Sequence, residues 1–262
     1  MQRPANGSVP AHRSNRTSGR PPGRRPVSDE SLAELAHVVA TDGAISRDSG
    51  NLEDATYDRM RQALIDGRFH PGQRFTIRAL ASVFGISAMP VRDALKRLVA
   101  ERAFSLLPNR SVTVPLMSRA RFQEIVQIRL SLETMITVRA TNCISPTAIE
   151  AMTVDHHHMC SAVARGDATQ YFASNRSFHF RLYRAAGTVE MFPMIESMWM
   201  QIGPYLNQVF QSREGGTDLV DHHHTRIIRA LHRNDATAAA QAVWDDLSSA
   251  ADQILTTNWF SP

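Results

Sequence analysis

The sequence predicts a mainly α-helical protein, with an N-terminal winged helix-turn-helix domain followed by an all-α antiparallel bundle of about six helices. Three observations indicate this fold. Residues 76–101 read as two short helices joined at Gly85. Residues 104–114 read as two short strands. After residue 117, apolar residues recur at helical spacing, and no strand pattern is found there.

The helix-turn-helix lies in TIRALASVFGISAMPVRDALKRLVAE, residues 76–101. Leu80 and Phe84 share one face of its first helix, and Gly85 breaks the helical run. Ser87 is expected to cap the second helix with its hydroxyl oxygen. The second helix places an apolar stripe inward and leaves its cations outside, which suits a helix that enters a DNA major groove. A plain helical hairpin with a solvated outer face would show the same pattern.

The stretch that follows favours the DNA-binding interpretation. Residues 104–107 and 111–114 read as strands, joined by a turn at 108–110 that carries an arginine at or near its tip. A further helix, which begins near Leu52 and stops at Gly67, precedes the motif. A three-helix unit that ends in such a hairpin is a winged helix-turn-helix.

The segment LIDGRFHPGQRFTIRALASVFGISAMPVRDALKRLVAERAF, with PNRS after it, resembles the DNA-binding head of GntR-type bacterial transcription regulators. The resemblance covers roughly residues 52–116 without a gap and includes the PVR-x-AL core. It implies contacts to DNA from an arginine before the first motif helix, from the start of the second helix and from the wing tip. The matching residues, with Lys96 added as a cation of the second helix, are Arg78, Ser87, Ala88, Met89, Arg92, Lys96 and Arg110.

Two residues of the head depart from the family pattern. Ala88 stands where the family usually has arginine or another polar residue, and Ser111 stands where the wing usually has glycine. The resemblance therefore implies a shifted base preference and a less tight wing turn.

Length and composition fit this organisation. The chain has 262 residues, 43% of them apolar, and a net charge of +4, which suits a polyanionic partner. Its two cysteines give neither a disulfide framework nor zinc-finger spacing. The sequence shows no signal peptide and no run near the ~18 apolar residues of a spanning helix. We therefore expect a cytoplasmic protein with no membrane partner.

We divide the chain into an N-terminal extension over residues 1–50, the head over 51–117 and a helical domain over 118–262. Residues 1–27 are rich in Pro, Gly, Ser, Asn and Arg, so they are expected to be disordered. Their arginines either attract phosphates or only solubilise the chain. A short helix is expected over residues 28–39.

The helical domain is predicted to hold six amphipathic helices. The first carries an apolar stripe of Phe122, Ile125, Ile128, Leu132 and Ile136. The six predicted ranges are 118–141, 145–166, 167–186, 188–212, 217–233 and 234–256.

Three segments of this domain resemble the ligand-binding domain of the FadR branch of the same family, often called FCD. They are IRLSLE, which holds Arg129 and Glu133, then residues 175–187 and residues 224–247. The resemblance implies a bundle that binds a small organic-acid effector and forms a homodimer. Arg129 is either a clamp for the effector carboxylate or the partner of Glu133 in a structural salt bridge.

Many members of that branch hold a divalent metal in the bundle. The matching positions here are Asn175, His179, His224 and Asp246, of which Asn175 replaces an acid and Asp246 a histidine. This set could hold zinc, nickel or manganese, although asparagine is a poor ligand for them. Alternatively, Arg129, Asn175, His179 and His224 bind the acid directly in a metal-free polar pocket.

Histidines occur in two further patterns. The runs at 156–158 and 222–224 cannot each put three imidazoles on one ion, because consecutive helical residues point about 100° apart. We expect His224 to face inward and residues 156–158 to form a solvated face. The aromatic and methionine side chains of residues 191–206, Trp199 included, are expected to form bundle core rather than a cofactor site.

The resulting hypothesis is a one-component transcription regulator that is not an enzyme. A dimer would bind a near-palindromic operator, and a small carboxylate metabolite would relieve repression. One alternative is a metal-dependent enzyme with an accessory nucleic-acid-binding head, although no general base lies beside the metal-like set. Another is an architectural DNA protein with no effector.

Overall fold

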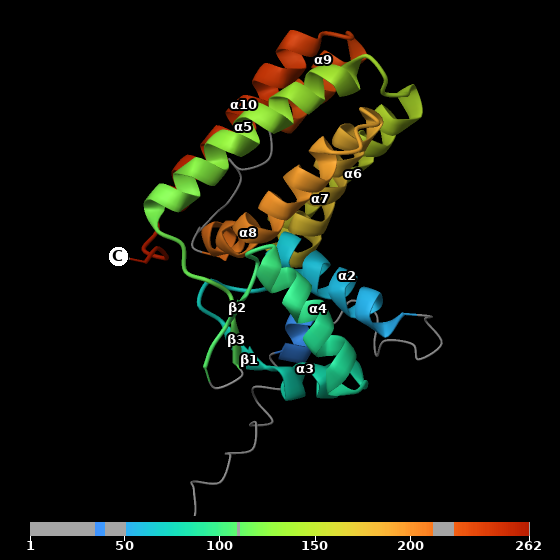
Figure 1. Ribbon diagram of the computed structural model, residues 1–262. Coiled ribbons are helices and arrows are strands. Elements are labelled where there is room, and N and C mark those ends of the chain that lie inside the picture. Colours follow the sequence, from blue (N-terminus) through green and yellow to red (C-terminus); the bar gives the residue numbers. More distant parts are fainter. Residues whose placement is uncertain (1–34, 40–50, 109–110, 212–222, 262) are drawn as a thin grey trace, which may run out of the picture.

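The computed structural model describes residues 35–39, 51–108, 111–211 and 223–261. It confirms a mainly helical fold in which a small head with a three-stranded sheet lies below a larger group of helices (Figure 1). The domain boundaries themselves stay predictions. In the described ranges, no helix is both long and apolar enough to span a bilayer.

The head holds the predicted three helices and the wing strands, with one more strand. In order these are α2 (Leu52–Ile65), β1 (Arg74–Thr76), α3 (Ile77–Phe84), α4 (Ala88–Ala100), β2 (Ser105–Leu106) and β3 (Ser111–Thr113). Gly85 ends α3 in the left-handed region with φ 67°, as the predicted turn requires. Thr76 caps α3 by accepting the Ala79 N–H at 3.1 Å.

The prediction that the Ser87 hydroxyl caps α4 was wrong. Ser87 is the N-cap residue by its backbone, but its side chain makes no capping hydrogen bond. A capping hydroxyl binds the N–H of the second or third helical residue, and the third here is Pro90, which has no N–H. The exposed Ser87 hydroxyl is therefore not committed to the helix.

The strands form an antiparallel sheet in the order β1-β3-β2, so the wing strand β3 is central. Its register pairs Val112 with Phe75 on one side and with Leu106 on the other. Sequence analysis did not predict β1, which has only three residues. Phe75 packs with Phe104, which directly precedes β2, at a ring-centroid distance of 5.4 Å, and both rings belong to the buried core.

The helical domain holds the six predicted helices in its described residues. They are α5 (Arg119–Thr141), α6 (Pro146–Arg165), α7 (Ala168–Ala185), α8 (Met191–Gln211), α9 (His223–His232) and α10 (Ala236–Leu255). Ser118, Ser145 and Asp167 are the first residues of three predicted ranges, and the side chain of each accepts a backbone N–H at the start of a helix. The predicted start of the fifth helix, residues 217–222, lies outside the described residues.

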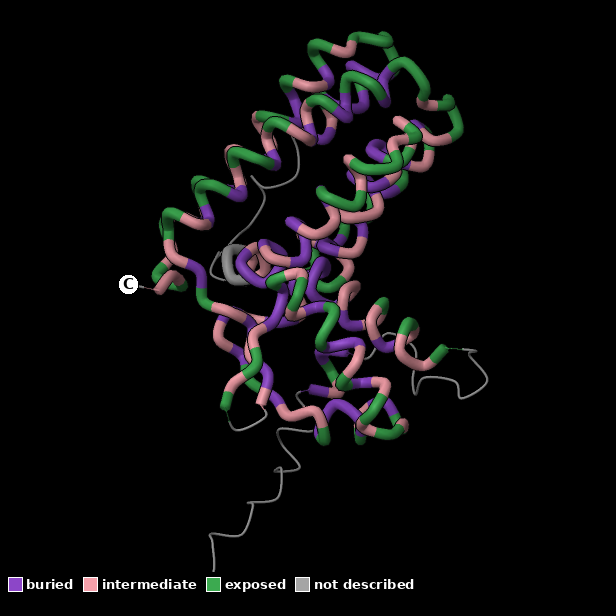
Figure 2. Tube along the Cα trace, viewed as in Figure 1, coloured by how far each residue is buried: buried purple, intermediate pink, exposed green. Residues whose placement is uncertain are grey.

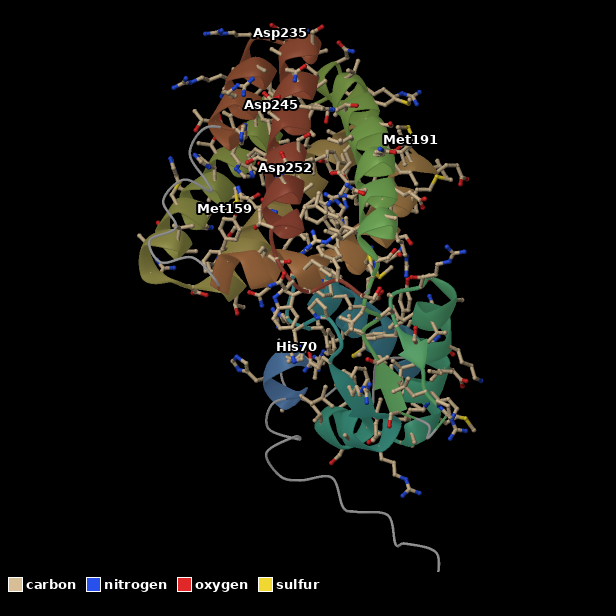
Figure 3. All side chains as sticks on the ribbon, turned by 90° about the vertical axis from the view of Figure 1, so that its left-hand side faces the viewer. His70, Met159, Met191, Asp235, Asp245 and Asp252 are labelled. Carbon is tan, nitrogen blue, oxygen red and sulfur yellow. The ribbon has the colours of Figure 1, made fainter. Side chains whose placement is uncertain are left out.

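Helices α5 and α10 pack along each other and α6 packs along α7, with α9 against α10 (Figure 1). Figure 3 follows α10 from Asp235, far from the head, to Asp252, nearer the head. Figure 2 shows the buried residues on the sides of these helices that face one another.

The buried face of α5 differs from the predicted one. Ile128 is 50% exposed, whereas Arg129 and Glu133 are buried in line with Phe122, Ile125 and Ile136. The prediction placed Ile128 inside because it assumed that the stripe is apolar throughout. Two charged residues occupy the inward positions instead, and they pair with each other.

The head packs on the helical domain through α2 and α8. A Cβ atom built on Gly203 of α8 would overlap the carbonyl oxygen of Leu64 in α2, so the two backbones meet there directly. Beside this contact, Asn207 of α8 donates to the carbonyl oxygen of Gly67 at 2.8 Å. Arg176 of α7 donates to the buried Asp66 carboxylate at 2.7 Å. The domains therefore share one junction of close polar and backbone contacts.

Part of the N-terminal extension belongs to the described structure. Residues 35–39 are helical, and Leu35, Val38 and Val39 are buried in the same apolar core as the head. This confirms the end of the predicted helix over 28–39. The rest of that helix, residues 1–27 and most of the predicted linker lie outside the described residues.

Candidate functional site

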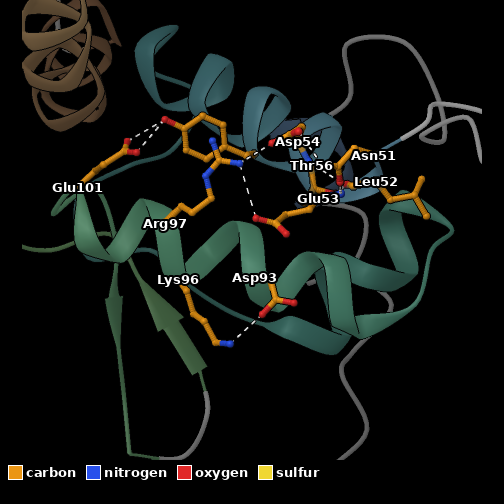
Figure 4. Close-up of polar contacts among 10 residues, drawn as sticks. Asn51, Leu52, Glu53, Asp54, Thr56, Asp93, Lys96, Arg97 and Glu101 are labelled. Atoms are coloured by element: carbon orange, nitrogen blue, oxygen red, sulfur yellow. Dashed lines mark hydrogen bonds and ion pairs between the residues drawn. The ribbon is translucent and has the colours of Figure 1, made fainter.

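The first candidate site is the outer face of α4 in the head. Met89 is 61% exposed, Ser87 and Arg92 are exposed, and Ala88 is half-buried. Lys96 pairs with Asp93 at 2.8 Å on the side of α4 away from α2 (Figure 4). Apolar residues of α4 face the opposite way, into the core of the head.

Two arginines near this face keep their charge available. Arg78, near the start of α3, and Arg92 are exposed and have no ion-pair partner in the described part of the chain. Unpaired guanidinium groups suit phosphates and the acceptor edge of guanine. Of the predicted DNA-binding residues, only Arg110 lies outside the described residues, and Ser111 begins β3 beside it.

Arg97, the third cation of α4, makes contacts within the head. It points to α2, where it pairs with Asp54 at 2.5 Å and stacks over the Tyr57 ring at 3.9 Å (Figure 4). Burial and a hydrogen bond to Glu101 raise the pKa of Tyr57 to about 12. Arg97 therefore stabilises the head and lies apart from the outer face of α4.

The second candidate site is a buried group of two histidines and one carboxylate in the helical domain. His179 of α7 and His224 of α9 are each 1% exposed. His179 Nε2 lies 3.3 Å from Asp246 Oδ2, and His224 Nε2 lies 4.0 Å from Asp246 Oδ1. Asn175 Oδ1 lies 3.1 Å from His224 Nε2. The structure thus brings together all four residues that the sequence singled out.

The proton on His179 can be placed from its neighbours. Tyr183 donates its hydroxyl hydrogen to Glu133 at 2.6 Å, so its oxygen accepts from His179 Nδ1–H at 3.2 Å. The Nε2 lone pair of His179 then faces the Asp246 carboxylate. The Nε2 lone pair and the carboxylate oxygen repel each other unless a positive charge lies between them. That charge is either a proton or a metal ion.

The charge state of Asp246 depends on the residues around it. Burial alone would raise the pKa of the Asp246 carboxyl, but the facing imidazoles of His224 and His179 outweigh burial and hold that pKa well below its usual range. Asp246 is therefore ionised. Ligand atoms of His179, His224 and Asp246 all lie within 4.8 Å of one another, a spacing and chemistry that fit a divalent cation.

A cavity adjoins this group. Arg129, Asn175, His179 and Asp246 line it, and it continues along α10 past Ser249 to Gln253. Oε1 of Gln253 and Nδ1 of His223 are buried, and the described residues offer them no hydrogen-bond partner. The other lining residues, mostly apolar or aromatic, are Tyr171, Phe172, Trp199, Leu206, Phe210, Leu247 and Ala250. A mixed wall of this kind suits a small organic molecule with polar groups.

Sequence reasoning missed several of these residues. Ser249 and Gln253 follow Asp246 at three and seven positions, which is the same face of a helix, so helical spacing from Asp246 could have found them. Trp199 is 3% exposed and belongs to the bundle core as predicted. Its indole N–H also donates to Glu133 at 3.2 Å, and its ring lines the cavity.

The prediction that residues 156–158 form a solvated face was wrong for His156. His157 and His158 are exposed, but His156 is 8% exposed and its ring stacks on His224 at 5.9 Å. Its Nε2 also contacts the Thr225 hydroxyl at 3.2 Å. Because α6 and α9 pack together, one imidazole of the run turns inward and supports His224.

The structure confirms the salt-bridge interpretation of Arg129, and its role as a clamp for an effector stays a prediction. Arg129 Nε donates to Glu133 Oε1 at 2.6 Å, which is the structural salt bridge. The same guanidinium lies over the Trp199 ring at 4.9 Å and lines the cavity. Its charge is therefore largely balanced by Glu133 before any ligand arrives.

Comparison with protein families divides the chain as the structure does. The model of bacterial regulatory proteins of the gntR family matches residues 52–114, and the FCD domain matches residues 124–249. The chain is 31% identical over 153 residues to the HTH-type transcriptional regulator McbR of Escherichia coli, covering 58% of this chain and 69% of that protein. It is 22% identical over 204 residues to the gluconate operon transcriptional repressor of Bacillus subtilis, covering 74% and 82%.

Solved structures show the same architecture. The structure of E. coli McbR/YncC matches with a TM-score of 0.74 and 25% identity, over 78% of this chain and 97% of that one. A GntR regulator structure from Rhodococcus sp. RHA1 matches with a TM-score of 0.64 and 21% identity, over 78% of this chain and 98% of that one, and supports the fold alone.

Proposed function

Because the chain belongs to the bacterial gntR family of regulatory proteins and carries an FCD domain, we propose that it is a repressor that binds operator DNA through its head and releases it when a small organic acid binds in the helical bundle. The relatives are named as transcription regulators and repressors. The alternative of a metal-dependent enzyme finds no support in them.

The DNA side of the proposal rests on the outer face of α4. Arg78 and Arg92 are exposed, and within the described residues neither has an ion-pair partner, while the uncommitted hydroxyl of Ser87 lies at the start of the helix. In a helix-turn-helix protein this end of the second helix enters the major groove. Arg110 at the wing, with Lys96 on α4, would add contacts to the DNA backbone.

The effector side rests on one observation, the charge of the cavity wall. Arg129 and Glu133 neutralise each other, so the charge beside the cavity is set by the ionised Asp246 and by the positive charge between it and the two imidazoles, either a proton or a metal ion. Without that positive charge an organic acid would meet a net negative wall, and like charges repel strongly where water is excluded. A divalent metal ion would make this wall net positive, whereas a single proton would only neutralise Asp246.

We propose that His179, His224 and Asp246 hold a divalent metal ion, with Asn175 as a neutral oxygen beside them. Zinc, nickel and manganese suit two imidazoles and a carboxylate. The ion would supply the positive charge that attracts the effector carboxylate. Tyr183 and Glu133 orient His179 behind the site, while His156 supports His224.

We propose further that the protein acts as a homodimer, with one head for each half of a near-palindromic operator. Ile128, Met135 and Val138 of α5 are exposed by 50%, 54% and 42%, and their spacing places them along one side of the helix. An exposed apolar stripe of this kind is a candidate contact between subunits. Sedimentation should show a dimer that Met135→Lys weakens, and a monomeric wild type would refute the dimer.

Fluorescence anisotropy with the full chain tests the proposed function. Labelled duplexes from the regions beside its own gene are titrated with protein at fixed salt, with unrelated duplex as competitor. One fragment should bind at least about 10³-fold more tightly than unrelated DNA. Equal affinity for every fragment would leave only nonspecific attraction and would refute an operator-binding regulator.

A further inference from the structure

Met89 is a large apolar side chain that the fold of the head leaves in water. It is the second residue of α4 and is 61% exposed, whereas Val91, Leu95 and Leu98 of the same helix are buried. Exposed apolar surface is unfavourable in water, and Met89 makes no contribution to the core that would require it. Its side chain is therefore available for a contact made outside the folded chain.

The neighbours of Met89 indicate what that contact is. Helical spacing places Met89, Arg92 and Lys96 along one face, and Figure 4 shows Lys96 pointing away from α2 on that side. The small Ala88 lies next to Met89 and leaves room around it. In duplex DNA the base edges lie inside the groove and the phosphates lie along its rim. A helix that enters the groove with Met89 first would bring Met89 to the base edges and the cations Arg92 and Lys96 nearer to the phosphates.

The chemistry of methionine selects among the four base edges. A thioether is at most a weak acceptor and cannot donate a hydrogen bond. In the major groove, thymine presents a 5-methyl group beside its O4 acceptor, while guanine, adenine and cytosine present donors or acceptors and no methyl group. Those polar groups would lose water against Met89 without gaining a partner, which is unfavourable.

We infer that Met89, with Ala88 beside it, selects a T·A base pair in each operator half-site by packing against the thymine 5-methyl group. The inference rests on the proposed function, because it requires that α4 enters the major groove. It adds the base and the chemical group that this end of α4 reads.

The test replaces single thymines of the bound operator fragment with deoxyuridine. Deoxyuridine lacks only the 5-methyl group and keeps all hydrogen-bonding groups of thymine. At the position read by Met89, the wild-type protein should bind the deoxyuridine duplex about fourfold more weakly, because one methyl-sized group is no longer buried. Met89→Ala should bind both duplexes with equal affinity.

Met194→Ala is the matched control. Met194 of α8 is 53% exposed and lies outside the head, so this variant should keep the wild-type loss on deoxyuridine. Unchanged wild-type affinity at every deoxyuridine position would overturn the inference and leave operator binding intact. If Met89→Ala also bound the deoxyuridine duplex more weakly than the thymine duplex, by as much as the wild type does, the inference would be overturned, because another residue would then read the methyl group. Failure to distinguish operator from unrelated DNA would overturn both the inference and the proposed function.

Discussion

Arg176 donates to the Asp66 carboxylate at 2.7 Å, and it directly follows Asn175, which lines the cavity. Asp66 is buried at the end of α2 in the head, whereas Arg176 belongs to α7 of the helical domain. One turn of α7 therefore contacts both the candidate effector site and the DNA-binding head. A shift of this turn on ligand binding would reach the head without passing through a flexible linker.

Arg176→Ala should destabilise the protein by about 2 kcal/mol, because it leaves the buried Asp66 without its main charged partner. For a protein of this size, thermal unfolding followed by circular dichroism should show a melting temperature lower by about 6 °C. Arg165→Ala provides the control. Arg165 is 60% exposed and lies 4.0 Å from Asp167, so its loss should change stability by less than about 0.5 kcal/mol. Equal effects of the two variants would contradict the role given to Arg176.

Gly203→Ala should separate the head from α8. Replacing glycine by alanine inside a helix normally stabilises it by roughly 1 kcal/mol. Here the added Cβ would overlap the Leu64 carbonyl oxygen, so the sign should reverse and the head should become more sensitive to limited proteolysis. In Gly187→Ala the new Cβ meets no atom within 4 Å, and only the φ of +61° costs about 1–2 kcal/mol. A Gly203→Ala variant as stable and protected as the wild type would show that the domains do not pack at this point.

Arg92→Ala should weaken operator binding by roughly 1–3 kcal/mol and relax sequence preference, if its exposed guanidinium reads a base. Arg97→Ala is the informative comparison, since Arg97 pairs with Asp54 and stacks on Tyr57. That variant should lower the melting temperature of the head but keep the operator preference of the wild type. Anisotropy titrations on the operator and on a mutated operator measure the affinity and the sequence preference of each variant. Preference lost in Arg97→Ala and kept in Arg92→Ala would place the reading surface elsewhere.

Asp246→Asn distinguishes the metal site from a metal-free pocket. If Asp246 is a metal ligand, calorimetry with Zn²⁺ should show at least about a tenfold loss of affinity, and organic-acid binding should fall with it. In a metal-free pocket the same change removes a repelling charge and should strengthen acid binding. Asp245→Asn is the control, because Asp245 pairs with Arg226 at 2.7 Å and is not among the residues that line the cavity. Stronger acid binding by Asp246→Asn would refute the metal.

Much of the fold could be predicted from the sequence because its signals are local. Gly85, Ser118, Ser145 and Gly166 each mark a helix end by the chemistry of a cap, and the structure confirms each one. The spacing of Asn175 and His179 likewise places two candidate ligands on one face of α7. Pairing between elements far apart in the chain was harder to predict. The strand β1 was missed because three residues carry no periodic signal and form a strand only by pairing with β3.

The errors in the candidate site have the same origin. The buried positions of Arg129 and Glu133 on α5 could not be read from an apolar pattern, because the two charges compensate each other and Tyr183 and Trp199 of other helices donate hydrogen bonds to Glu133. His156 turns inward because α6 meets α9, a packing that the sequence does not display.

The wrong prediction of a cap at Ser87 has a different cause and could have been avoided from the sequence, since Pro90 at the third helical position has no N–H to donate.

The most direct test of the central claim is the operator affinity of the metal-loaded protein, measured by anisotropy with and without each member of a panel of small organic acids. The account predicts that at least one acid weakens operator binding by about fivefold or more, in the range of allosteric coupling, and that Asp246→Asn no longer responds to it. An operator affinity that no acid changes, in a protein shown to bind its metal, would contradict the account of the helical domain as a sensor that controls the head.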